Sequence, residues 1–383
     1  MSNSVFITKI AAFLPNEPVT NDEIEDVLGV VNNKKSRALK IVLRNNGIKT
    51  RHYVLDKKTG QPRYNNAQLT AMAVKALSDD EFSIDDVECL SCGTTIADQL
   101  VPGHAVMVHG ELGIPPCETA TTIGVCSSSM SSLKYGYMNV MSGCSSNAVA
   151  TGSEVASLTL RANAYASLND APNAEEIKCR PELAFEKDFL RWMLSDGAGA
   201  MLLEASPRAG QLSLRIDWIE VISFANELES CMYAGAEKDS AGHLTGWREF
   251  PLREMIEKDV LALKQDVKLL NKHIVPLTLE RGLSMVREKH DISVDEIDYF
   301  LPHISSEYFR EKLVQGLENI GFPIPQEKWF TNLSTKGNTG AASIYIMLEE
   351  LFNSGRLKSG QKILCFVPES GRFISSFMLL TVA

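Results

Sequence analysis

The 383-residue sequence lacks the features that would place it in a membrane or outside the cell. No apolar run approaches the roughly 20 residues needed to cross a bilayer. Residues 1–5, Met-Ser-Asn-Ser-Val, have neither the basic start nor the apolar core of a signal peptide. We therefore expect a cytoplasmic protein with no membrane partner.

Positive charge and paired cysteines are also scarce. The formal net charge of −10 argues against a general binder of nucleic acid or anionic membranes. The eight cysteines form no framework of the kind that small secreted domains use, so we expect reduced thiols. Cys89 and Cys92 form one CxxC in a strand-like apolar run, where side chains three residues apart point to opposite faces. This spacing favours core packing over a metal site.

The sequence does contain an internal repeat. Residues 83–90 read Ser-Ile-Asp-Asp-Val-Glu-Cys-Leu, and residues 293–300 read Ser-Val-Asp-Glu-Ile-Asp-Tyr-Phe. Each copy follows an amphipathic helical pattern, at residues 67–77 and 273–283, and each leads into an apolar strand. Taken alone, the octapeptide could recur by chance as an Asp-rich turn before a strand. The residues that follow each copy decide between chance and a true repeat.

The repeat continues in nearly the same register. A helix is predicted from Cys126 to about Met141, and another from Asn338 to about Phe352. Alternating strands and helices predict an α/β protein with largely parallel pairing. We expect two similar halves, residues 1–205 and 206–383, related by a pseudo-twofold axis. Cys126 and Asn338 would then occupy equivalent strand-to-helix turns and could converge on one site.

Cys126 is the first candidate for chemistry. It follows Gly124-Val125 and precedes a run of serines that begins the predicted helix. Unpaired N–H groups and the helix dipole at such a position favour the thiolate, which is the nucleophilic form. A structural cysteine is the alternative, and the other seven cysteines lack this setting.

His303 and Asn338 are the next candidates. His303 follows the buried-looking strand at residues 299–301, and ligands tend to bind at strand ends in α/β folds; a core histidine with satisfied hydrogen bonds is equally compatible. Asn338 lies between an extended segment and a helix. Its side chain could cap that helix or donate to an oxyanion, and the local sequence leaves both open.

Six stretches together resemble the β-ketoacyl-acyl-carrier-protein synthase III family of the thiolase superfamily. The likeness spans nearly the whole chain, in the right order and spacing. The matching stretches are Gly47-Ile48-Lys49-Thr50-Arg51, the Cys126 turn, Ser195-Asp196-Gly197-Ala198-Gly199-Ala200, Pro302-His303, Gly337-Asn338-Thr339 with Ala341-Ala342-Ser343, and Ser370-Gly371-Arg372-Phe373.

The resemblance implies the five-layered αβαβα thiolase fold and a homodimer. It implies that Cys126 holds an acyl group as a thioester, with the backbone N–H groups of Cys126 and Gly371 binding its oxyanion. His303 and Asn338 would stabilise the enolate of a malonyl or β-ketoacyl partner, which attacks the acyl group in a Claisen condensation. The partners would be acyl carrier protein, coenzyme A thioesters or both. No metal or redox cofactor is implied.

The chain also departs from the family pattern. The tryptophan that typically stacks on the coenzyme A adenine falls near Ile41, which suggests that both acyl groups arrive on carrier proteins. Arg310 and Lys312 are then candidates for docking an acidic carrier, with a solvated helix face as the alternative. Residues 98–116 are expected to form a loop that shapes the acyl pocket and the dimer contact.

Three functions remain open. The first is a ketosynthase of fatty-acid or polyketide-type specialised metabolism, and the second condenses and cyclises two β-ketoacyl thioesters to a cyclohexanedione or resorcinol precursor. The third is a non-enzymatic partner subunit that binds a carrier protein. Hydroxymethylglutaryl-coenzyme A synthase carries a catalytic glutamate in a Gly-Thr-Glu-Thr segment, and this chain has Gly93-Thr94-Thr95-Ile96 there, without that base.

Overall fold

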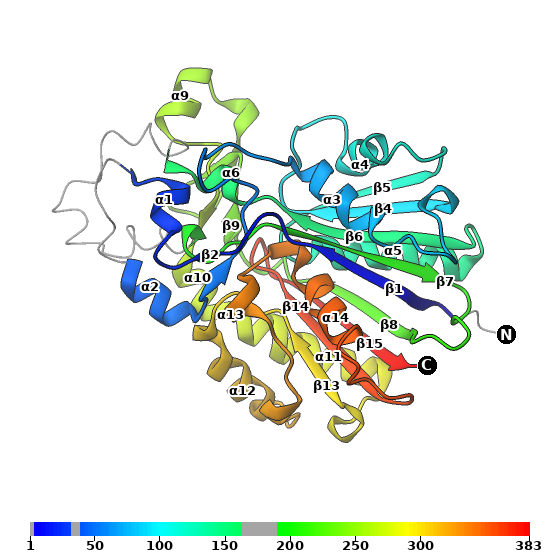
Figure 1. The fold of residues 1–383 in the computed structure, drawn as a ribbon. Coiled ribbons are helices and arrows are strands. Elements are labelled where there is room, and N and C mark those ends of the chain that lie inside the picture. Colours follow the sequence, from blue (N-terminus) through cyan, green and yellow to red (C-terminus); the bar gives the residue numbers. More distant parts are fainter. Residues whose placement is uncertain (1–3, 32–38, 163–189) are drawn as a thin grey trace.

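A computed structural model describes residues 4–31, 39–162 and 190–383 (Figure 1). Among them, nine strands form one mixed sheet in the order β13-β14-β15-β8-β1-β7-β6-β4-β5. The strands of its first part are β1 (Phe6–Phe13), β4 (Cys89–Thr94), β5 (Glu118–Ile123), β6 (Asn147–Glu154) and β7 (Gly197–Glu204). Those of its second part are β8 (Leu214–Ser223), β13 (Tyr299–Pro302), β14 (Lys362–Pro368) and β15 (Ile374–Val382).

The strand pairings repeat from one part to the other. β4 and β6 run parallel, as do β13 and β14, while β6–β7 and β14–β15 are antiparallel. β1 and β8 join the two parts through Phe6 opposite Arg215 and Ile7 opposite Leu214. The prediction of largely parallel pairing is wrong, because β1, β7, β8 and β15 all pair antiparallel. The division into halves at about residue 205 stays a prediction.

The two octapeptides fold alike. Each forms a single 3₁₀ turn, at Ile84–Asp86 and at Val294–Glu296. The side chains of Ser83 and Ser293 cap the two turns by accepting hydrogen bonds from the backbone N–H groups of Asp85 and Asp295. The turns lead into β4 and β13. The local repeat is therefore present in the structure as well as in the sequence.

Helices form three layers around the two parts of the sheet (Figure 1). One outer layer packs on β4–β7, the middle layer lies between the two parts of the sheet, and the other outer layer packs on β14 and β15. The outer helices on the first side are α3 (Asn66–Lys75) and α4 (His104–Leu112), and the middle ones are α5 (Ser128–Ser142) and α14 (Ser343–Phe352). The outer helices on the second side are α10 (Val267–His273), the π-helix η5 (Ile274–Arg281), α11 (Gly282–His290) and α12 (Arg310–Asn319).

Buried apolar side chains divide in the same way. One cluster packs under α3 and α4, a second surrounds the middle helices, and a third fills the space under α10–α12. Helix–sheet–helix–sheet–helix packing of this kind is the αβαβα arrangement, so the predicted five-layered fold is confirmed. The helices expected at residues 67–77 and 273–283 are also present, and the second is one part of a longer run over α10, η5 and α11.

Shorter elements connect these layers. They are β2 (Val19–Thr20), α1 (Ile24–Leu28), α2 (Leu39–Asn46), β3 (Thr50–Arg51), α6 (Ser157–Leu160), β9 (Met232–Tyr233), β10 (Ala236–Lys238), β11 (Leu244–Gly246), α9 (Leu252–Glu257), β12 (Lys264–Gln265) and α13 (Leu333–Lys336). Within the described ranges, no helix is long and apolar enough to cross a membrane. Cys89 and Cys92 belong to different core clusters, which confirms that they lie on opposite faces of β4.

Candidate active site

Cys126 lies on the turn between β5 and α5, and its side chain is buried. Burial raises the pKa of the Cys126 thiol above its usual value, and the carboxyl groups of Glu369 and Glu154 raise it further. The backbone N–H at the helix N-terminus does lower the pKa of Cys126, as expected, but its effect is the smaller one. Loss of solvent and two nearby carboxyl groups outweigh the backbone N–H, so the resting side chain is a neutral thiol.

His303 follows β13 directly, and its backbone N–H donates to the carbonyl of Phe366 on β14 over 2.8 Å. The imidazole is 3% exposed, and burial lowers the pKa of His303 to about 4. The ring is therefore neutral at neutral pH. Its Nε2 atom is buried without a hydrogen-bond partner among the described residues. An unpartnered buried nitrogen is costly unless a ligand meets it.

Asn338 lies on the turn between α13 and the 3₁₀ turn Gly340–Ala342. Its Oδ1 accepts a hydrogen bond from the N–H of Gly340 over 3.0 Å. The oxygen thus caps the turn, and donation by the Nδ2 group to an oxyanion stays a prediction. The segment before Asn338 is the short helix α13, whereas an extended segment was expected.

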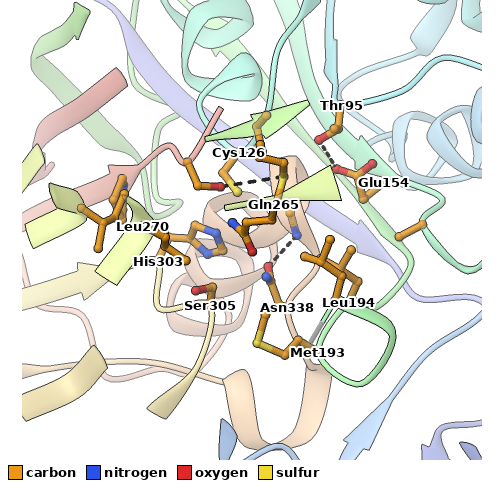
Figure 2. A pocket seen from close by; sticks show the side chains of 18 of the residues that line it. Thr95, Cys126, Glu154, Met193, Leu194, Gln265, Leu270, His303, Ser305 and Asn338 are labelled. Carbon is orange, nitrogen blue, oxygen red and sulfur yellow. Dashed lines mark hydrogen bonds between the residues drawn. The ribbon is translucent and has the colours of Figure 1, made fainter. Parts of the chain in front are cut away.

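Cys126, His303 and Asn338 line one cavity, whose empty space together with the solvent at its mouth is about 930 Å³. Figure 2 shows them around this cavity together with Glu154 and Thr95. The wall away from these polar groups is mostly apolar, and it includes Leu194, Leu270, Ile274, Val275, Phe309 and Leu313. A thiol and two uncharged polar side chains therefore face a space that could hold an apolar acyl chain.

A row of glycines brings the Cys126 and Asn338 turns together. Gly93, Gly152 and Gly199 lie side by side on β4, β6 and β7. A Cβ on Gly152 would lie 2.5 Å from the carbonyl oxygen of Ala341 and 2.7 Å from Cβ of Ser129. The start of α5 and the turn before α14 therefore rest directly on the sheet, and only glycine leaves room for both.

Gly371, the second proposed oxyanion-hole residue, is not among the residues that line the cavity, although Ser370 is. Backbone N–H groups of Gly371, Arg372, Ile374 and Val125 hydrogen-bond to the Glu369 carboxyl and lower its pKa, while burial raises it with the larger effect. The Gly371 N–H is thus engaged by Glu369 in this structure. Its role at an oxyanion stays a prediction that requires this contact to open.

The proposed docking residues have partners within the chain. Arg310 forms a two-point ion pair with Glu307, and the Lys312 ammonium donates to the Tyr308 hydroxyl over 2.9 Å. Phe309 and Leu313 from the same segment line the cavity, so the two cations lie close to its wall. Their role in carrier docking stays a prediction, and a carrier would have to compete with Glu307 for Arg310.

Residues 98–116 do not form the loop that was expected. They contain the helix α4, and none of them lines the cavity of this chain. The expectation that they shape the acyl pocket is therefore wrong within one chain, and their part in a dimer contact stays a prediction. Ile41 belongs to α2, but its side chain lies outside the described residues.

Two motif residues of the family pattern have structural partners. The buried Arg51 guanidinium donates to Oδ1 of Asn21 and to the carbonyl of Trp192, over 2.9 and 3.1 Å. The Asp196 carboxylate accepts hydrogen bonds from the N–H groups of Val54 and Ser157 over 2.7 and 2.9 Å. Neither side chain lines the cavity, so both hold the surrounding segments in place.

The cavity also contains a carboxyl group that sequence reasoning missed. Glu154 is the last residue of β6 and is 5% exposed. Its Oε2 accepts a hydrogen bond from the Thr95 hydroxyl over 2.5 Å. The available signal was an acidic residue directly after the small residues Gly152-Ser153, at the carboxyl end of a core strand.

Known proteins of similar sequence are named as β-ketoacyl-[acyl-carrier-protein] synthases III. Residues 288–379 match the family model described as 3-oxoacyl-[acyl-carrier-protein] synthase III C terminal. A β-ketoacyl-[acyl-carrier-protein] synthase III of Koribacter versatilis is 24% identical over 374 residues, which cover 98% of this chain and 96% of the relative. One of Clostridium perfringens is 25% identical over 318 residues, covering 83% of each chain.

Solved structures share the fold over nearly the whole chain. AbyA1, described as a tetronic acid condensing enzyme, has a TM-score of 0.75 at 22% identity, with coverage of 98% of this chain and 99% of its own. A variant of Xanthomonas campestris OleA has a TM-score of 0.75 at 20% identity, with 99% of each chain covered. The chain thus shares its fold with these condensing enzymes and is similar over most of its length to proteins named β-ketoacyl-[acyl-carrier-protein] synthase III.

Proposed function

We propose that this chain is a ketosynthase-type acyltransferase that forms a carbon–carbon bond by Claisen condensation. The observation that carries the proposal is the shared cavity of Cys126, His303 and Asn338, in which the His303 Nε2 has no partner among the described residues. A soft nucleophile opposite two hydrogen-bond donors matches the needs of an acyl-thioester and an enolate in one site. Relatives named as acyl-carrier-protein synthases support the same chemistry.

In the first half-reaction the Cys126 sulfur attacks the carbonyl of an acyl thioester. The sulfur–carbon bond forms, the donor thiol leaves, and the Cys126 proton passes to the departing sulfur. Because the resting thiol is neutral, the proton must leave as the bond forms. The backbone N–H groups of Cys126 and Gly371 are the proposed donors to the oxyanion, and the contact between Gly371 and Glu369 would open for this step.

In the second half-reaction His303 and Asn338 hold the carbonyl oxygen of the second thioester. The neutral imidazole, with its proton on Nε2, and the Asn338 Nδ2 group each donate a hydrogen bond. Loss of carbon dioxide from a malonyl group, or of an α-proton from another acyl group, leaves an enolate whose charge these donors stabilise. The enolate carbon attacks the Cys126 thioester, and the cysteine sulfur leaves.

The substrates are acyl groups carried by acyl carrier protein, coenzyme A or both. The apolar wall of the cavity supports groups longer than acetyl, as expected of a specialised-metabolite relative. Condensation with cyclisation of two β-ketoacyl thioesters is a second outcome that the same site could support. The non-enzymatic alternative is not favoured, because the three candidate side chains share one cavity and the relatives are named as enzymes.

The direct test is mass spectrometry of the products from a panel of acyl, malonyl and β-ketoacyl thioesters on carrier protein and on coenzyme A. We expect a condensed product with at least one pair, and no product from Cys126→Ala. The mass of the product also distinguishes a linear from a cyclised compound. A wild-type protein that takes no acyl group from any donor would instead support a binding subunit.

We also propose that the chain acts as a homodimer in the cytoplasm. The support for a dimer is that β5 is an edge strand among the described residues, that Ile123 on it is 62% exposed, and that Leu100 and Val101, between β4 and α4, are 74% and 82% exposed. An exposed edge strand with apolar side chains is prone to pair with another chain. Light scattering should give a dimer mass for the wild type and a lower mass for Ile123→Glu.

A further inference from the structure

Glu154 lies where two parallel strands end beside the cavity. β4 and β6 pair in register, with Thr94 opposite Ser153, so the next residues, Thr95 and Glu154, meet at the same edge of the sheet. The Glu154 Oε2 accepts from the Thr95 hydroxyl over 2.5 Å and from the N–H of Ala341 over 3.4 Å. Neither partner is a cation. A buried carboxyl without a charged partner is held at an electrostatic cost, which is typical of a functional group.

The same carboxyl contacts the turn that carries Asn338 and acts on the Cys126 thiol through its charge. A Cβ on Gly340 would collide with Oε2 of Glu154, so the turn that follows Asn338 lies directly on the carboxyl. On the other side, the charge of Glu154 raises the pKa of the Cys126 thiol. Glu154 also lines the cavity itself, as Figure 2 shows. It therefore shares one cavity with the thiol and with the proposed enolate donors.

We propose that Glu154 is a catalytic base that removes the α-proton of the second acyl thioester and later returns that proton to Cys126. This inference rests on the proposed function, and it adds a way of forming the enolate without loss of carbon dioxide. The substrate class it implies is an acyl thioester whose α-carbon carries hydrogen and no carboxyl group.

The step balances within the site. The Glu154 carboxylate takes the proton from the α-carbon, and the C–H electron pair becomes the carbon–carbon double bond of the enolate, with negative charge on the oxygen held by His303 and Asn338. The enolate carbon then attacks the carbonyl of the acyl group on Cys126. When the tetrahedral adduct collapses, the cysteine sulfur leaves and takes the proton from Glu154. No oxidant, reductant or metal is needed.

The electrostatics of the site are compatible with this role. Burial raises the pKa of Glu154 from 4.5 to about 7, and the Thr95 hydroxyl lowers it by a smaller amount. A base whose pKa lies near the working pH is populated in both forms and can accept and return a proton. Thr95 occupies the segment in which hydroxymethylglutaryl-coenzyme A synthase carries its glutamate, and here β6 supplies a carboxyl beside that segment.

The test separates proton removal from decarboxylation. Cys126→Ala protein, which cannot be acylated, is incubated in D₂O with a saturated acyl thioester of N-acetylcysteamine, and deuterium at the α-carbon is measured by mass spectrometry. In the same background, decarboxylation of the malonyl thioester is followed as a second activity. We expect deuterium exchange, and we expect Glu154→Gln to reduce it by about 10²-fold or more. Decarboxylation should stay within about threefold, because that step needs no base.

Glutamine keeps the shape of the side chain and an oxygen for Thr95 and Ala341, so a purely structural role predicts little change in either activity. Thr95→Val provides a second measurement, because loss of its hydrogen bond should move the pH midpoint of exchange upward. Decarboxylation without any exchange would overturn this inference and leave the proposed function standing. Absence of both activities, with no acylation of the wild type, would overturn both. Equal loss of both activities in Glu154→Gln, or little change in either, would also overturn the inference.

Discussion

Replacing Glu369 by glutamine should make the Cys126 thiol more acidic. Glu369 is 3% exposed and is, after burial, the largest cause of the raised pKa of Cys126. Glutamine keeps an oxygen for the N–H groups of Arg372 and Ile374, which donate to Glu369 over 3.2 and 3.1 Å, but it removes the negative charge. The thiolate should therefore become easier to form.

The size of the effect follows from the ionised fraction of the thiol. An ordinary cysteine with a pKa of about 8.5 is roughly 3% ionised at pH 7, and each further pKa unit lowers that fraction tenfold. The raised pKa puts Cys126 below this ionised fraction, so removing one buried negative charge should raise the rate of alkylation at neutral pH by about tenfold or more.

The assay is the pH dependence of alkylation by iodoacetamide, read at the Cys126 peptide by mass spectrometry. The pH midpoint, unlike the rate, does not depend on how easily the reagent enters the cavity. The exposed Cys144 in the same sample is the internal control and should be unaffected. A wild-type midpoint at or below that of an ordinary cysteine, or a midpoint unchanged by Glu369→Gln, would refute the assignment of Cys126 as a neutral resting thiol.

Three further predictions concern stability and pH. Gly152→Ala places a Cβ 2.5 Å from the carbonyl oxygen of Ala341 and 2.7 Å from Cβ of Ser129. It should therefore lower the free energy of unfolding in urea by about 1–3 kcal/mol and should also reduce acylation. A variant as stable as the wild type would contradict the close packing. The folded pKa of Glu154, about 7 instead of 4.5, contributes stability below about pH 4.5 that is lost as the pH rises through 7, about 3 kcal/mol in all. Glu154→Gln should therefore make the free energy of unfolding less dependent on pH between these values, and an unchanged pH dependence would contradict the raised pKa. His303, with its pKa lowered to about 4, should stay neutral down to that pH, so an imidazole resonance that titrates near pH 6.5 by NMR and is missing from His303→Gln would contradict its burial.

The sequence predicted much of the fold because its signals were local and periodic. The Ser-capped turns at Ser83 and Ser293 lead into β4 and β13, as the octapeptide repeat predicted. Antiparallel pairing could not be predicted in this way, because the direction of β7 and β15 depends on which distant strands they join. The repeat shows which segments correspond, but it gives no information on the direction in which their neighbours run.

The candidate site could be predicted where the local sequence around a single residue indicated its place at the end of a strand or the start of a helix. Cys126, His303 and Asn338 each follow a strand or precede a helix, and the structure brings them to one cavity. Glu154 and Glu369 were missed because their effect depends on burial beside residues more than 20 positions away in the sequence. For the same reason the helix N-terminus alone did not indicate a neutral thiol, since the two carboxyl groups that raise the pKa of Cys126 come from other segments.

The most direct test of the account is to separate the two half-reactions. Wild type, His303→Ala and Asn338→Ala are each incubated with an acyl thioester, and the gain of acyl mass on Cys126 is measured on the intact protein. The isolated acyl-enzymes are then mixed with the second thioester, and the condensed product is measured in a single turnover. We predict that all three proteins are acylated and that only the wild type condenses at its full rate. Loss of acylation in His303→Ala, with normal condensation once the acyl group is supplied, would contradict the assignment of sulfur to acyl transfer and of His303 to the enolate.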